Sequence, residues 1–165
     1  MERIKNKSSM IKNMTPKLVR GQFVFVTSKY ADVDIDLLKQ SKATFAEEEG
    51  LSLVVDLELA RDRGFDTSQI MRCITLEVYS DLEGVGLTAA VANALAENDI
   101  PCNMIAAYSH DHAFVPNSLA QDAFEILTDL QKQAAINDKP NYPSRLNDQT
   151  LDHPRPPTQH HLRPL

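Results

Sequence analysis

The chain has 165 residues, of which 42% are hydrophobic and 6% aromatic with no tryptophan, and its formal net charge is −6. This length suits one domain or two very small ones around an aliphatic core, and the acidic balance argues against nucleic acid as the main partner. No apolar run is long enough to cross a bilayer and no signal peptide is evident, so we expect a cytoplasmic protein without a membrane partner. Cys73 and Cys102 both fall inside predicted strands, which favours reduced, buried thiols, although a disulfide between neighbouring strands stays open.

The first part of the chain predicts a basic arm followed by a small αβ unit. Residues 1–14 are polar and lysine-rich without a clear period, which is typical of a mobile arm. Residues 15–68 form the first predicted half. Its expected elements are a two-face-buried strand at 22–27, a weak helix at 32–40, strands at 43–46 and 51–55, and a helix at 56–64.

The second predicted half, residues 69–136, repeats the same order with stronger patterns. Its expected elements are a strand at 72–79, a glycine turn, a helix at 86–97, strands at 102–108 and 112–115, and a helix at 118–134. This half lacks a final strand, and we hypothesise that the strand at Phe23–Val26 is exchanged into that gap. Residues 137–165 hold six of the nine prolines and predict a disordered, histidine-containing tail.

The stretch from Ile74 to Pro116 resembles the ACT domain. The residues that carry the resemblance are Ile74-Thr75-Leu76, Val85 to Val91, Ala94-Leu95-Ala96, Cys102-Asn103, His110-Asp111-His112 and Phe114-Val115-Pro116. They are most similar to small bacterial proteins with two ACT-like halves, related to the ACT pairs of aspartate kinases and of a eukaryotic arginine sensor. The resemblance covers about residues 15–135 and implies an α+β fold: two ferredoxin-like βαββαβ halves, with antiparallel sheets and helices on one face.

The resemblance also implies an effector site at the glycine turn and on the strand beside it. The implied contacts are Gly84, Val85, Gly86, Leu87, Asn103, Met104 and Ile105, with Asp81 and Glu83 available for a ligand's ammonium group. From the residues alone, a helix that begins after glycines offers unpaired N–H groups suited to an amino acid's carboxylate. Plain turn chemistry is the alternative, because glycines and acidic residues also serve a helix start without any ligand. We expect the other half to wall this site.

A second candidate is His110-Asp111-His112, at the bend between two predicted strands. His110 and His112 share one strand face and are weak metal candidates, since two ligands do not make a zinc site. Asp111 is a candidate to accept hydrogen bonds from a bound ammonium group, or it forms a structural bend.

These observations favour a non-catalytic regulatory or sensor module that binds a small-molecule effector, an amino acid, without a cofactor, and that forms a homodimer. No catalytic motif is present in the sequence. The alternatives are a structural or protein-interaction protein without a ligand, and a metal-binding protein built on His110-Asp111-His112.

Overall fold

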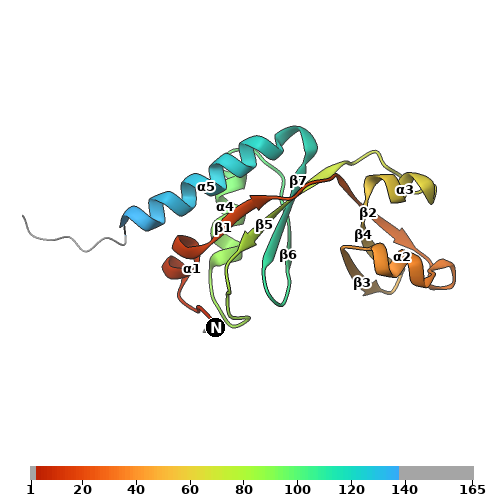
Figure 1. Ribbon diagram of the computed structural model, residues 1–165, viewed down its shortest axis with the longest axis horizontal. Coiled ribbons are helices and arrows are strands. Elements are labelled where there is room, and N and C mark those ends of the chain that lie inside the picture. The colour runs from red at the N-terminus through yellow and green to blue at the C-terminus, as the bar shows by residue number, and fades with distance from the viewer. Residues whose placement is uncertain (1–2, 138–165) are drawn as a thin grey trace, which may run out of the picture.

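The computed structural model describes residues 3–137, which form two lobes joined by a narrow neck (Figure 1). Seven strands make one antiparallel sheet in the order β3-β4-β2-β5-β7-β6, and β1 also pairs with β5. The strands are β1 (Thr15–Leu18), β2 (Phe23–Ser28), β3 (Ala43–Glu47), β4 (Gly50–Asp56), β5 (Met71–Glu77), β6 (Asn103–Ala106) and β7 (Asp111–Pro116). The helices are α1 (Lys7–Asn13), α2 (Ile35–Gln40), α3 (Leu57–Asp62), α4 (Leu87–Ala96) and α5 (Ala120–Asn137), with short 3-10 turns at Tyr30–Asp32 and Asn117–Leu119.

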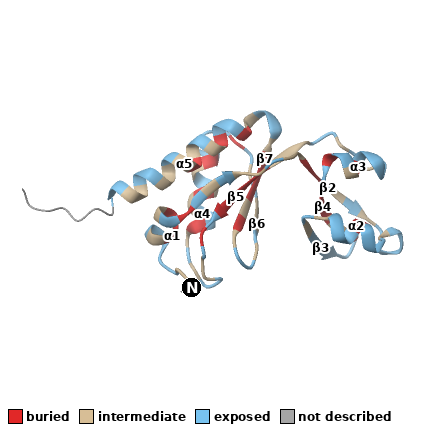
Figure 2. Ribbon diagram, viewed as in Figure 1, coloured by how far each residue is buried: buried red, intermediate tan, exposed pale blue. Residues whose placement is uncertain are grey.

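The second half holds the larger core. Strands β1, β5, β7 and β6 form its sheet, and α1, α4 and α5 cover one face (Figure 1). The helix expected at 86–97 is present as α4, and its Leu87, Val91 and Leu95 form an apolar stripe that is buried in this core. Figure 2 shows the buried residues concentrated on these strands and on the inner sides of the helices. This core fixes the start of α4, where the candidate site lies.

The first half is smaller and packs separately. Its strands β2, β3 and β4 pair with one another, and α2 and α3 contribute Leu37, Leu57 and Ala60 to a second core. A third cluster joins the halves through the sheet faces that carry no helix. There, Phe114 of β7 meets Phe23 and Phe25 of β2 in edge-to-face pairs with centroids 6.0 and 5.2 Å apart. The α+β fold of two ferredoxin-like halves is therefore confirmed.

The second half is completed by a strand from the N-terminal part, but not by the strand we expected. The strand β1 pairs with β5 from Thr15↔Glu77 to Leu18↔Ile74. In contrast, β2 pairs with β4 along its length and reaches β5 only at Phe23↔Met71. The hypothesis that Phe23–Val26 fills the gap is thus wrong. Pro16 is tolerated in β1 because this strand has one paired side, so the missing N–H faces away from the sheet.

The expectation of a mobile arm over residues 1–14 is also wrong for the described part. Asn6 caps α1 by accepting a hydrogen bond from the Ser9 N–H at 3.1 Å, and Met10 and Met14 are buried at 0% and 1% exposure. The helix contacts both α4 and α5. Residues 3–18 therefore belong to the second half, although they precede the first half in sequence. Residues 138–165, and with them nearly all of the tail predicted to be disordered, lie outside the described residues.

Candidate functional site

The residues predicted to form one site lie in two separate regions of the structure. Asp81, Gly84, Leu87 and Asp111 line a cavity of about 70 Å³ at the glycine turn of the second half. Asn103 and Ile105 instead line clefts between the two halves. Met104 packs against the core of the second half, because successive residues of β6 point to opposite sheet faces.

Local chemistry shapes the glycine turn. The Asp81 carboxylate accepts a hydrogen bond from the Glu83 N–H at 2.9 Å, and its carbonyl accepts one from the Gly84 N–H at 2.8 Å. Gly86 then occupies the N-cap of α4 with φ of 101°, a left-handed conformation that favours glycine. Because glycine has no side chain, it provides no cap to the first amides of α4. The helix thus begins with N–H groups that a ligand can use.

Asp111 is the buried charge of this cavity. It begins β7 and shares a sheet face with Ala113 and Val115, so its side chain belongs to the helix-covered side. Its exposure is 6%, and within residues 3–137 it has no hydrogen-bond or ion-pair partner. Burial raises the pKa of this carboxyl group, and the nearby His110 offsets part of that rise. An unpaired buried carboxylate is costly unless a cation completes it.

The wall over the turn comes from the N-terminal segment, so the expectation that the other half walls this site is wrong. The Ile4 backbone bonds to Tyr79 and Asp81: its N–H donates to the Tyr79 carbonyl at 2.9 Å, and its carbonyl accepts from the Asp81 N–H at 3.0 Å. The Lys5 ammonium lies 2.5 Å from a Glu83 carboxylate oxygen. Met10 also lines the cavity. The turn is therefore roofed by residues 4–10.

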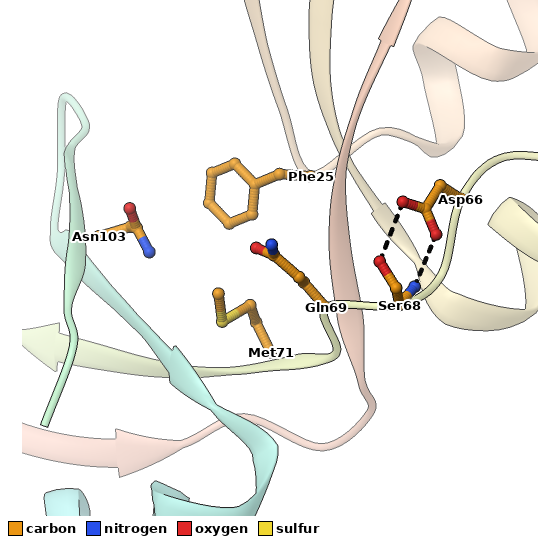
Figure 3. A pocket seen from close by; sticks show the side chains of 6 residues that line it. All are labelled: Phe25, Asp66, Ser68, Gln69, Met71 and Asn103. Atoms are coloured by element: carbon orange, nitrogen blue, oxygen red, sulfur yellow. Dashed lines mark hydrogen bonds between the residues drawn. The ribbon is translucent and has the colours of Figure 1, made fainter.

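Two further clefts lie between the halves. The sequence analysis did not predict either of them. The first has a volume of about 330 Å³ and is lined by Phe25, Asp66, Ser68, Gln69, Met71 and Asn103 (Figure 3). Asp66 accepts hydrogen bonds from the Ser68 N–H and hydroxyl, both at 2.9 Å, and these bonds lower the pKa of its carboxyl group. The second, of about 280 Å³, lies over β3 and β4 and includes Phe45 and Ile105. The Asp-Thr-Ser sequence at 66–68 signals a turn, but nothing local places it opposite β6.

The two histidines have separate hydrogen-bond partners. His112 Nδ1 lies 3.0 Å from the Thr75 hydroxyl, and His110 Nδ1 lies 3.3 Å from the Val78 carbonyl. Over residues 3–137, no group of three or more His, Cys, Asp or Glu side chains is arranged to hold a metal ion. Both cysteines are free, and burial raises the pKa of the Cys102 thiol to about 11.

Comparisons with known proteins agree with this architecture. The ACT domain matches residues 4–72 and again residues 70–129. A Vibrio cholerae protein of unknown function, described as a possible transport protein, is 41% identical, with a TM-score of 0.66 over 75% of this chain and 94% of that chain. An Agrobacterium tumefaciens protein matches at 14% identity and a TM-score of 0.57, over 72% of this chain and 89% of that chain.

Aspartokinase subunits have a similar fold. The aspartokinase alpha and beta subunits give 13% identity and a TM-score of 0.51, over 71% of this chain and 97% of that chain. No curated protein matches the chain. Among residues 3–137, no helix has the length and apolar character needed to span a membrane.

Proposed function

Because this chain belongs to the ACT-domain family, we propose that it is a regulatory module that binds an amino acid at the glycine turn of its second half and has no catalytic activity of its own. ACT domains are typically regulatory modules that bind amino acids. The match with the Vibrio cholerae protein covers nearly all of that chain, so both halves belong to the comparison.

The observation that carries the proposal is the Asp111 carboxylate in the cavity at the start of α4, which has no hydrogen-bond or ion-pair partner among residues 3–137. An amino acid has a cationic and an anionic group on neighbouring atoms. Its ammonium group would donate charge-assisted hydrogen bonds to the Asp111 carboxylate, and Asp81 lines the same cavity. Its carboxylate would accept hydrogen bonds from the first amides of α4, where the helix dipole favours negative charge.

Regulation would follow from the position of the site between the sheet and the N-terminal segment. A ligand shifts a conformational equilibrium only by binding one arrangement better than another. Here the arrangement at stake is the packing of residues 4–10 on the glycine turn, because those residues roof the cavity. Since α1 is followed directly by β1, which pairs with β5, the bound ligand would act on the contact that ties the N-terminal segment to the second half.

The test is thermal shift and calorimetry with each of the twenty amino acids on the wild type, Asp111→Asn and Asp66→Asn. Both variants replace one carboxylate by an amide, but Asp66 lies in the cleft between the halves. We expect at least one amino acid to stabilise the wild type and Asp66→Asn, and to lose its effect on Asp111→Asn. Loss of the effect in Asp66→Asn alone would move the site to the cleft, and no effect of any amino acid on the wild type would end the proposal.

A second candidate function, a protein-interaction role through the sheet, is favoured by exposed aromatic side chains in the first half. Phe45 on the edge strand β3 is 72% exposed, and Phe25 is 44% exposed. A homodimer through this surface is one form of that role. Light scattering of the wild type and Phe45→Ser tests the homodimer. A wild-type dimer that dissociates in the variant supports an interaction through this surface, whereas monomeric masses for both proteins count against a homodimer.

A further inference from the structure

We propose that Met10 sets the size of the ligand at the glycine turn, so that the wild-type site accepts small amino acids such as glycine, alanine and serine and rejects larger ones. This inference rests on the proposed function, and it adds a specificity-determining residue from a segment outside the turn. Met10 is the fourth residue of α1, it is completely buried, and it lines the cavity with Asp111.

The Met10 side chain occupies the space directly above the glycine turn. A Cβ atom built on Gly84 would lie 2.9 Å from Met10 Sδ and 3.2 Å from its terminal methyl carbon. The thioether therefore rests against the Gly84 backbone, where no side chain could fit. A ligand held by Asp111 and by the start of α4 would meet this thioether next to its own side chain.

The remaining space is small. At about 70 Å³, the cavity is far smaller than the clefts of about 330 and 280 Å³ between the halves. Such a space favours an amino acid with a short side chain. Leucine carries three more side-chain carbons than alanine, and these would have to fit beside Met10 in the same cavity.

Met10 is held in place on both sides along the chain. Before it, Ile4 is hydrogen-bonded to the backbone of Tyr79 and Asp81, and Lys5 pairs with Glu83. After it, Met14 is buried in the same core, and β1 begins at Thr15 and pairs with β5. Because this segment is anchored at both ends, the Met10 backbone is held over the turn, and a larger ligand would have to displace the Met10 side chain from the cavity.

The chain offers a matched control for the obvious variant. Met14 lies one helical turn from Met10, is 1% exposed and packs in the same core, but it does not line the cavity. Met10→Ala and Met14→Ala thus remove the same atoms from the same core. Only the first enlarges the site, because the thioether and terminal methyl group that it removes line the cavity side of Gly84.

The experiment measures binding of glycine, alanine, serine, valine, leucine and methionine to the full chain by calorimetry. For the wild type and Met14→Ala, we expect binding of the first three and none of leucine. For Met10→Ala, we expect leucine to gain at least about tenfold relative to alanine, as one or more methylenes in an apolar pocket do. A milder Met10→Val replacement is measured in parallel, so that a folded variant is available if the alanine variant unfolds.

The outcomes distinguish a failure of the role of Met10 from a failure of the proposed function. A wild type that prefers leucine, or identical ligand profiles for the Met10 and Met14 variants, would overturn the role of Met10 while leaving amino-acid binding in place. If neither the wild type nor any variant binds an amino acid, the proposed function itself fails.

Discussion

Replacing Asp111 by Asn should stabilise the ligand-free protein at pH 7. Asp111 is 6% exposed and its carboxylate has no hydrogen-bond or ion-pair partner within residues 3–137, so the folded state loses much of the hydration of this group without an equivalent contact. A buried group left in this way costs about 1–3 kcal/mol, and more when it is charged. Since the amide of Asn is also polar, we expect a net gain of about 1 kcal/mol, or roughly 3 °C in the melting temperature for a chain of this size.

The pH dependence gives the sharper test. Burial raises the pKa of Asp111 above its ordinary value of 3.8, so the folded state binds this proton more tightly than the unfolded state does. The resulting stabilisation is fully present below the ordinary pKa and is lost as the pH rises through the raised one. Urea unfolding of the wild type and Asp111→Asn should therefore give similar free energies near pH 4, and a gap in favour of the variant that opens toward pH 7.

Asp66→Asn is the control with the opposite sign. Hydrogen bonds from Ser68 lower the pKa of Asp66, so its replacement should weaken the folded state at pH 7 and matter less in acid. Asp81, which lines the same cavity, and His110, which acts on the charge of Asp111, are unchanged in both proteins. If Asp111→Asn is less stable than the wild type at pH 7, the carboxylate has a partner in solution and the reasoning on its unmet charge is wrong.

Three other predictions follow from the same geometry. Gly86→Ala should lower the free energy of unfolding by about 1–2 kcal/mol, because φ is 101° there, and it should also weaken amino-acid binding. Gly64→Ala is the control: φ is 71° and no atom lies within 4 Å, so thermal melts should show only the destabilisation caused by the backbone conformation. Cys102, with its pKa raised to about 11, should react slowly with a thiol reagent at pH 7.5 and rapidly in urea; a fast native reaction would contradict its burial. A fragment of residues 69–137 should show little secondary structure by circular dichroism until a peptide of residues 3–21 supplies β1. If the fragment folds by itself, the second half does not depend on the pairing of β1 with β5.

The second half could be predicted closely from sequence because its signals are local. Alternation at Ile74, Leu76 and Val78, and the stripe at Leu87 and Val91, describe a strand and a helix that are both present. The glycine turn and Asp111 were identified as two separate candidates, and the structure places both at one cavity. These elements lie within about forty residues of one another, and each carries enough periodicity to be identified without its partners.

The N-terminal segment could not be predicted because its structure depends on distant contacts. Met10 lies in a helix of seven residues and Met14 directly follows it, and such a short helix gives no clear period in the sequence. Pro16 argues locally against a strand, and β1 forms only because β5, about sixty residues later, offers an unpaired edge. Because side chains alternate along a strand, Asn103 and Met104 lie on opposite faces of β6. Which of these two faces turns toward the first half depends on the packing of Phe114 against Phe25, which the sequence does not reveal.

The two halves have the same fold, and a comparison of their corresponding turns explains why only one of them is a candidate site. In the first half, Asp34 is the N-cap of α2 and accepts a hydrogen bond from the Leu37 N–H at 2.7 Å. Arg63 donates a hydrogen bond to the Asp34 carboxylate and lowers its pKa. Within the first half, the start of α2 and the charge of Asp34 therefore both have partners from the chain itself. In the second half, Gly86 stands at the N-cap without a side chain, and the carboxylate of Asp111 has no ion-pair partner among residues 3–137. In the proposed function, the carboxylate and the ammonium group of a bound amino acid would supply to the second half the anion and the cation that Asp34 and Arg63 supply within the first half.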